Sequence, residues 1–155
     1  MLDIKAGRAY LVRLLARREY SQFELRKKMR EKTYADDVID SALAWVIEHD
    51  LQSDQRFTEC FVRYRKNSGY GPNWIKSALK EKGIASTTIS AILAPEQYCW
   101  QEVLEQLWHK KFAHADDLDS AKAKAKQIRF LIARGFCYAE VSAFVLRNNR
   151  ICDKL

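Results

Sequence analysis

Apolar side chains recur every three to four residues along almost the whole chain, and stretches of alternating apolar and polar residues are absent. This period predicts helices throughout and no strands. Helix caps and breakers divide the pattern into nine helices. They cover about residues 4–18, 22–32, 36–49, a segment from Asp54 to just before Gly69, 72–82, a short helix from Ser86, 97–112, 118–134 and a segment that begins after Cys137 and ends near Asn148.

The same periodicity predicts which side chains are buried. In the fourth helix Phe57, Cys60, Phe61 and Tyr64 stand at i, i+3, i+4 and i+7 and form one apolar face. The other helices follow the same rule. Their predicted buried residues are Ile4, Leu11, Leu14, Leu15, Ile39, Leu43, Val46, Ile89, Ile92, Leu93, Trp100, Val103, Leu104, Leu107, Trp108, Ala121, Ile128, Leu131 and Ile132.

One kind of helix start occurs three times. In segment 69–75 (Gly-Tyr-Gly-Pro-Asn-Trp-Ile), Gly71 is a suitable N-cap, Pro72 suits the first helical position and Tyr70 precedes them as a hydrophobic staple. Segment 20–25 repeats the arrangement with a capping box of Ser21 and Glu24. Segment 136–141 keeps the aromatic, acidic and apolar positions but has a cysteine as the cap. These copies indicate an internal repeat.

The repeat predicts an all-α protein of three tandem three-helix repeats, at residues 1–53, 54–95 and 96–155, that form an elongated, curved, right-angled helical array. Pro95 closes the second repeat. One irregularity remains. The start motif lies between the first and second helices of the first two repeats, but between the second and third helices of the last. Either the last repeat has shifted in phase or its closing helix has been lost.

Charge is the first indication of function. The chain has a net charge of +7 and a pI near 9.3, which favours a polyanionic partner. Basic against acidic residues number 10 and 9 in residues 1–53, 7 and 3 in residues 54–95, and 10 and 8 in residues 96–155. The middle repeat therefore has the largest excess.

Several basic side chains share helix faces: the pair Lys76 and Lys80, the pair Arg63 and Lys66, and a row of Lys122, Lys126 and Arg129. For any single one, solvation of the helix surface is the commoner role. Together they can face phosphate or acidic protein surface. The candidate contact residues are Arg17, Arg26, Arg63, Arg65, Lys66, Lys76, Lys80, Lys111, Lys122, Lys126, Arg129 and Arg134.

Trp74 is a candidate aromatic contact. It occupies the third helical position, where Glu24 stands in the first copy of the motif, so the cap does not require a tryptophan. Trp74 is therefore either a core residue or an exposed contact. Tyr70, Gly71 and Pro72, by contrast, are explained by helix-start rules without any ligand.

No pattern of catalysis or of ligand binding is found. The four cysteines form no Cys-x-x-Cys pair, the three histidines share no helical face, and no catalytic triad or Gly-rich phosphate loop is present. Charged residues interrupt the N-terminal apolar residues, and no apolar run approaches membrane-spanning length. We expect a cytoplasmic, monomeric protein with reduced thiols that is not an enzyme and has no metal or cofactor.

Several segments together resemble the RecX family of recombinase regulators. The segments are Asp54-Gln55-Arg56-Phe57, Arg63, Arg65, Gly69-Tyr70-Gly71-Pro72, Ile75, Leu79, Lys82-Gly83-Ile84, residues 17–27, Lys110-Lys111-Phe112, Arg129-Phe130-Leu131 and Arg134-Gly135-Phe136. The resemblance implies three tandem three-helix repeats that bind the RecA filament on single-stranded DNA. It also implies inhibition of the recombinase, ATPase and co-protease activities of RecA and of filament extension. The chain departs from the family in Gln52, where an apolar residue is expected, and in a short N-terminal arm.

Two other functions remain open. Three-helix units with short turns also describe helix-turn-helix proteins that bind DNA directly, although the fifth helix offers only Asn73 and Ser77 near its start for reading bases. A single-strand binder would need exposed aromatic side chains beside the lysines, and most aromatic residues here lie on apolar faces.

Overall fold

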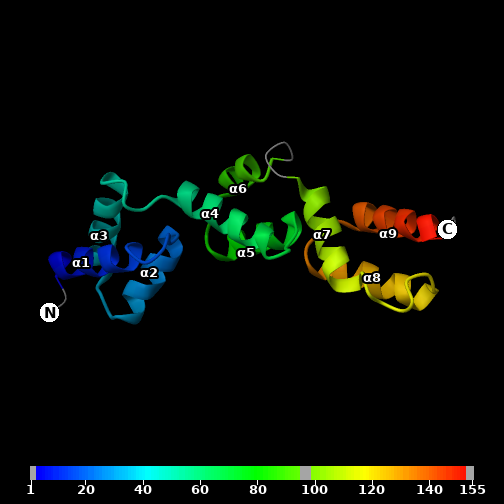
Figure 1. Ribbon diagram of the computed structural model, residues 1–155. Coiled ribbons are helices and arrows are strands. Elements are labelled where there is room, and N and C mark those ends of the chain that lie inside the picture. The colour runs from blue at the N-terminus through cyan, green and yellow to red at the C-terminus, as the bar shows by residue number, and fades with distance from the viewer. Residues whose placement is uncertain (1–2, 95–98, 153–155) are drawn as a thin grey trace. The chain divides into compact units, whose positions relative to one another are not determined.

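The computed structural model describes residues 3–94 and 99–152, with side chains described up to residue 148. Within these ranges the protein consists of helices without strands (Figure 1). Their bounds are α1 (Ile4–Leu15), α2 (Gln22–Glu31), α3 (Asp36–Glu48), α4 (Asp54–Asn67), α5 (Pro72–Glu81), α6 (Ser86–Ile92), α7 (Trp100–Phe112), α8 (Ala121–Ala133) and α9 (Tyr138–Cys152). Each predicted helix is confirmed within a few residues at its ends. Pro95 and the predicted start of the seventh helix at residue 97 lie outside the described residues.

The helices pack into two compact units. Unit 1 comprises residues 1–61 and 78–92, and unit 2 comprises residues 62–77 and 93–155. The boundary falls within α4 and α5, so each unit contains part of both helices. The repeat boundaries expected from the sequence and the elongated, curved shape remain predictions.

Unit 1 is built on α3, against which both α1 and α2 pack (Figure 1). Leu11 of α1, Leu25 and Met29 of α2, and Ile39 and Val46 of α3 form a shared core that excludes solvent completely. The apolar periodicity of α1 and α3 therefore predicted their inner faces. It failed at the exposed Ile4, since α1 begins there and its first turn extends beyond the core.

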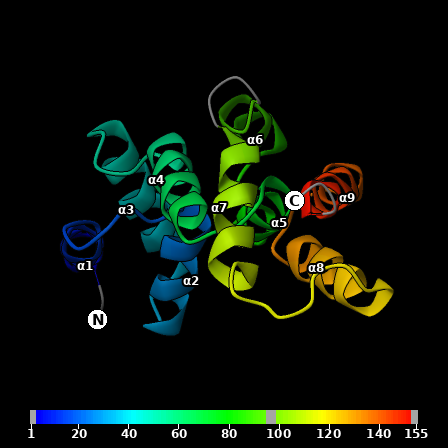
Figure 2. The ribbon, with the colours of Figure 1, turned by 45° about the vertical axis from the view of Figure 1, so that its right-hand side comes forward.

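In unit 2, α8 lies beside α9, as Figures 1 and 2 both show, and also contacts α7. The predicted face of α7 is confirmed. Val103, Leu104, Leu107 and Trp108 are buried, and Trp100 packs against them. Their partners on α8, α9 and the connecting turn are Leu131, Phe136, Val141, Phe144 and Val145.

The inner face of α8 is only partly the predicted one. Leu131 is buried as predicted, but Ala121 and Ile132 are exposed and Gln127 is buried instead. The Gln127 amide accepts a hydrogen bond from Trp108 Nε1 (2.8 Å) and donates to two backbone carbonyls of its own segment. A buried glutamine that satisfies its amide this way is compatible with the core, although a polar side chain gives no apolar signal in the sequence.

The predicted apolar face of α4 is wrong at two of its four positions. Phe57 is buried, whereas Cys60 and Tyr64 are exposed, Tyr64 by 66%. The buried row includes Thr58 and Val62 instead. Thr58 can join this row because its hydroxyl donates to the Asp54 carbonyl (2.7 Å), which removes the need for water. Asp54 is the first residue of α4, and Ser53 is the cap, its hydroxyl accepting from the Arg56 amide.

The irregular third copy of the start motif has a simple explanation. The last repeat has all three helices, α7, α8 and α9, so its closing helix has not been lost. Segment 136–141 begins α9, the third helix of that repeat. The second helix, α8, has a cap of its own at Ser120, whose hydroxyl accepts from the Ala123 amide.

Candidate interaction surface

The second helix of each repeat ends in the same kind of turn. At the ends of α2, α5 and α8, one residue takes a positive φ: Thr33 (64°), Gly83 (76°) and Gly135 (103°). The amide after each of these residues donates to a carbonyl five positions back, at 3.1 to 3.3 Å. The three turns are therefore equivalent sites.

In unit 1, the start of α2 docks on the turn at the end of α5, a contact that we call joint 1. The Ser21 hydroxyl donates to the Lys82 carbonyl (2.9 Å) and also accepts from the Glu24 amide (3.1 Å), as the predicted cap requires. Phe23 lies against Gly83, where a Cβ atom would come within 2.6 Å of the Phe23 Cβ. Joint 1 therefore needs glycine for close approach as well as for its φ.

In unit 2, the start of α5 docks on the turn at the end of α8 in the same way, forming joint 2. The Gly71 amide donates to the Arg134 carbonyl (2.7 Å), and the Asn73 amide donates to the Gly135 carbonyl (2.9 Å). A Cβ atom on Gly135 would lie 2.5 Å from the Trp74 backbone nitrogen. Two of the amides at the start of α5, which have no partner within the helix, thus find acceptors in the turn.

A cluster of aromatic and cationic side chains surrounds joint 2. The Tyr70 and Trp74 rings are in contact, with centroids 4.1 Å apart and planes tilted by 30°. The guanidinium group of Arg65 lies 5.2 Å from the Trp74 ring, and that of Arg134 lies 4.9 Å from the Tyr70 ring. Such cation–π contacts hold guanidinium groups in place without neutralising them. Tyr64, Phe130 and Lys111 extend this group, which we call the Trp74 cluster: Tyr64, Arg65, Tyr70, Trp74, Lys111, Phe130 and Arg134.

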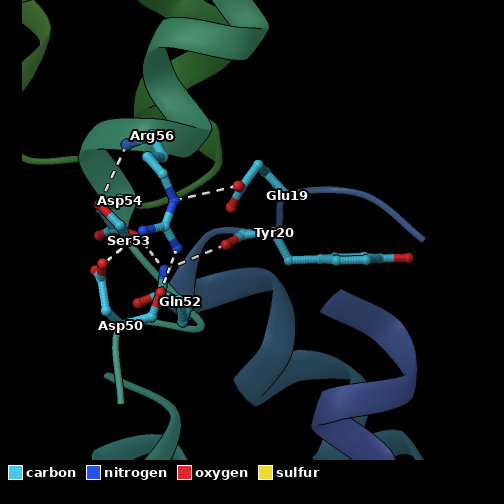
Figure 3. A network of polar contacts seen from close by, with 7 residues as sticks. All are labelled: Glu19, Tyr20, Asp50, Gln52, Ser53, Asp54 and Arg56. Carbon is cyan, nitrogen blue, oxygen red and sulfur yellow. Dashed lines mark hydrogen bonds and ion pairs between the residues drawn. The ribbon is translucent and has the colours of Figure 1, made fainter. Parts of the chain in front are cut away.

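Arg56 forms a second polar centre, in unit 1, that the sequence did not predict (Figure 3). Its guanidinium group pairs with Glu19 (3.2 Å) and with Asp50 (2.9 Å) and donates to the Asp50 carbonyl (2.8 Å). Burial lowers the pKa of Arg56, but the two carboxylates outweigh it and raise that pKa above its usual value. This network fixes the start of α4 to the segment before α2.

The same region shows why position 52 has a glutamine where an apolar residue was expected (Figure 3). It is buried, and its amide nitrogen donates to the Tyr20 carbonyl (3.2 Å) and to the Asp54 carboxylate (3.0 Å). Asp54 in turn accepts from the Gln22 amide at the start of α2 (3.0 Å). The polar residue at position 52 therefore takes part in joining two helix starts, where an apolar residue could not.

Positive charge is concentrated in unit 2. The residues of unit 2 include 14 basic and 8 acidic side chains, against 13 and 12 in unit 1. Among the described residues of unit 1, ion pairs neutralise part of the charge. In the described part of the chain, six of the predicted contact residues of unit 2 form no ion pair: Lys76, Lys111, Lys122, Lys126, Arg129 and Arg134. Unit 2 is therefore the more attractive half of the protein for a polyanion.

The structure brings some predicted residues together and separates others. Arg65, Trp74, Lys111 and Arg134 meet in the Trp74 cluster, and Trp74 is half-buried there. The predicted row on α8 is exposed along its length, as are Arg63 and Lys76 in unit 2. Lys66 is half-buried and lines an open pocket of about 330 Å³ with Glu102 and Lys110. The remaining candidates, Arg17, Arg26 and Lys80, belong to unit 1.

Arg26 is the least suitable candidate, because it already pairs with Asp40 at 2.8 Å. Tyr64, which is exposed in the Trp74 cluster, was expected to be buried because of its place in an apolar row. Its signal in the sequence was its neighbour Arg65, whose guanidinium group lies 5.3 Å from the Tyr64 ring.

No group of three or more histidine, cysteine or acidic residues that could hold a metal ion is found among residues 3–94 and 99–152. None of the helices in those ranges is long and apolar enough to cross a membrane. Among the described residues, Cys60, Cys99 and Cys137 take part in no disulfide.

The fold and the basic surface define an all-α, tandem three-helix-repeat protein. Three domain models of one family match it, described as the first, second and third three-helix domains of RecX, at residues 8–45, 53–93 and 100–145. The chain therefore belongs to the RecX family of regulatory proteins.

Comparison with individual relatives supports the same family membership. "Regulatory protein RecX" of Haemophilus influenzae (strain PittEE) is 37% identical over 145 residues, which are 93% of this chain and 95% of the relative. "Regulatory protein RecX" of Pseudomonas savastanoi pv. phaseolicola (strain 1448A / Race 6) is 42% identical over 123 residues, 79% of each chain. The crystal structure of RecX from Lactobacillus salivarius has the same fold, with a TM-score of 0.76, 22% identity and coverage of 96% of this chain and 97% of its own.

Proposed function

We propose that this protein binds the RecA nucleoprotein filament and inhibits its recombinase, ATPase and co-protease activities. The observation that carries the proposal is the excess of positive charge in unit 2 in a member of a family of regulatory proteins. A filament of protein on single-stranded DNA presents many phosphates and acidic side chains in regular order. Many weak contacts with such a surface give an affinity that falls as salt screens the charges.

The row on α8 offers the simplest such contact. Lys122, Lys126 and Arg129 are all exposed and occupy successive turns of one helix. They have no carboxylate partner in the described part of the chain. A polyanion therefore meets them without first displacing an internal ion pair.

The test is DNA-dependent ATP hydrolysis by RecA, measured with increasing amounts of this protein and of a variant with Lys122, Lys126 and Arg129 replaced by glutamate. The parent protein should inhibit hydrolysis, and the variant should inhibit it at least about tenfold less, because each reversed contact is worth on the order of 1 kcal/mol. A hydrolysis rate that the parent protein leaves unchanged would refute the proposal.

A matched variant controls for net charge. Lys5, Arg13 and Lys27 are exposed in unit 1, and glutamate at all three positions changes the total charge by the same amount. This variant should inhibit RecA nearly as well as the parent protein. If both variants lose inhibition equally, total charge matters and the surface of unit 2 does not.

Direct reading of DNA by α5 is less well supported. A recognition helix presents its first turn to the major groove. The first turn of α5 faces the α8 turn instead, since the Gly71 and Asn73 amides both donate to it. The start of α2 also faces a turn, because the hydroxyl of its cap, Ser21, donates to the Lys82 carbonyl. Binding of the isolated protein to duplex DNA, with a clear preference among sequences, would restore the helix-turn-helix alternative.

A further inference from the structure

Joints 1 and 2 are built alike, so a residue of one can be compared with its equivalent in the other. Ser21 and Gly71 are the caps, and Glu24 and Trp74 both stand at the third helical position. On the turn side, Lys82 and Arg134 both precede the glycine. Of these three pairs only one differs in charge: a glutamate stands in joint 1 where joint 2 has a tryptophan.

In joint 1 the glutamate neutralises the cations around it. The Glu24 carboxylate pairs with Lys82 (3.1 Å) and with Arg18 (2.9 Å), and its side chain is only 13% exposed. Arg18 also stacks on Tyr20, with its guanidinium carbon 3.6 Å from the ring centroid. Joint 1 thus contains an aromatic ring and two cations, and the carboxylate of Glu24 pairs with both cations.

In joint 2 the corresponding carboxylate is missing. Arg134 stacks on Tyr70 and lies 5.5 Å from the Phe130 ring, but it forms no ion pair within the described residues. Trp74 cannot supply an acceptor, because its indole nitrogen is only a donor. Joint 2 therefore has an aromatic ring and a cation, as joint 1 does, but it has no carboxylate that pairs with the cation.

We propose that the Trp74 cluster binds an acidic side chain of a partner protein, which supplies in trans the carboxylate that Glu24 supplies within joint 1. The inference deepens the proposed function, since the filament is the partner that it concerns. Arg134 is held on two rings, so its guanidinium edge is positioned in advance for a carboxylate. Tyr64, 66% exposed beside Arg65, offers an aromatic surface to the residue next to that carboxylate.

Joint 1 is the reason for choosing a carboxylate over a phosphate. In joint 1 the third helical position holds Glu24, whose carboxylate pairs with cations that lie beside an aromatic ring, as Arg134 does in joint 2. A phosphate of single-stranded nucleic acid would satisfy Arg134 as well, so the experiment separates the two ligands.

The decisive variant is Trp74→Glu, which gives joint 2 an internal carboxylate like that of joint 1. This carboxylate should pair with Arg134 and so prevent the cluster from binding a carboxylate of a partner protein. Glutamate also suits the third helical position. Trp74→Gln is the matched control, because it removes the same indole ring without adding charge. Ala115→Glu adds an equal charge to unit 2 at an exposed position of the α7–α8 loop, outside the cluster.

Two labelled probes are titrated at low salt by fluorescence anisotropy: a peptide of repeated Glu-Glu-Tyr and an oligothymidylate. Trp74→Glu should bind the peptide about tenfold more weakly than Trp74→Gln, as expected for one charge-assisted contact. Ala115→Glu should stay within about twofold of the parent protein, and the oligothymidylate should not distinguish Trp74→Glu from Trp74→Gln.

Three results would overturn the inference: no binding of the peptide by the parent protein, equal peptide affinities of Trp74→Glu and Trp74→Gln, or a selective loss of oligothymidylate binding in Trp74→Glu. The last would assign the cluster to phosphate. The RecA hydrolysis assay is independent of both probes. A parent protein that binds the peptide without inhibiting RecA would refute the proposed function and leave the carboxylate site standing.

Discussion

Replacing Gly135 with alanine tests whether joint 2 holds the start of α5 on the turn of α8. The added Cβ would lie 2.5 Å from the Trp74 backbone nitrogen and 3.0 Å from the Gly71 carbonyl oxygen. Both neighbours are backbone atoms, which cannot rotate away as a flexible side chain can. The joint must therefore open, and the Gly71 and Asn73 amides lose their acceptors, Arg134 and Gly135.

Two terms set the expected loss of stability. Alanine at a positive φ costs about 1–2 kcal/mol, and two lost hydrogen bonds cost about 0.5–1.5 kcal/mol each. The free energy of unfolding should thus fall by about 2–5 kcal/mol, a large part of the total for a domain of this size. Urea denaturation followed by circular dichroism at 222 nm measures the change.

Thr33 provides the control, because the turn of α2 has a positive φ of 64° and, within the described residues, Thr33 is exposed and no helix start is hydrogen-bonded to this turn. Thr33→Gly removes the strain of a left-handed threonine but adds chain entropy, so its stability should stay within about 1 kcal/mol of the parent protein. If Gly135→Ala also stays within that range, the close approach at joint 2 is not a stabilising contact and the reasoning fails.

Three further changes test the cores and the polar networks. Gln127→Leu should lower the free energy of unfolding by about 1–3 kcal/mol in urea, since it leaves the indole nitrogen of Trp108 buried without an acceptor; an unchanged midpoint would contradict this. Hydrogen bonds from the Ser120 hydroxyl and from nearby backbone amides lower the pKa of Asp117. The contribution of Asp117 to stability is therefore complete above the carboxyl pKa of the unfolded chain and is lost as the pH falls through the lower pKa of the folded protein. Asp117→Asn should flatten the acid side of a plot of melting temperature against pH. A curve parallel to that of the parent protein would contradict this prediction. Arg56→Gln should cost about 1 kcal/mol in low salt and less as sodium chloride is added, because its ion pairs are partly exposed; a loss independent of salt would indicate packing instead.

Local rules accounted for the helix ends. The Ser21 cap, the start of α5 at Pro72 and the stop before Gly83 depend on residues within one turn of each other, and all three are confirmed. Apolar periodicity likewise predicted the inner faces of α3 and α7. It failed on α4, where Thr58 joins the buried row by bonding to its own helix and Tyr64 is released to the surface.

The joints could not be predicted, because they connect residues far apart in sequence. Gly71 and Arg134 were each recognised for local reasons, but no local rule pairs an amide with a carbonyl more than sixty positions away. Arg65, Trp74, Lys111 and Arg134 were consequently named one by one as candidates, without the contacts that bring them into the Trp74 cluster. The position of Trp74 where Glu24 stands in the first repeat was the one signal that pointed there.

The turn at the end of α2 has a consequence for how such a chain can grow. It has the hydrogen bonds of the α5 and α8 turns, with Thr33 in the place of glycine. Another repeat joined by the same rule ahead of α2 would have to seat its helix start where the Thr33 side chain stands. By the rule of joints 1 and 2, such an added repeat would need glycine in place of Thr33.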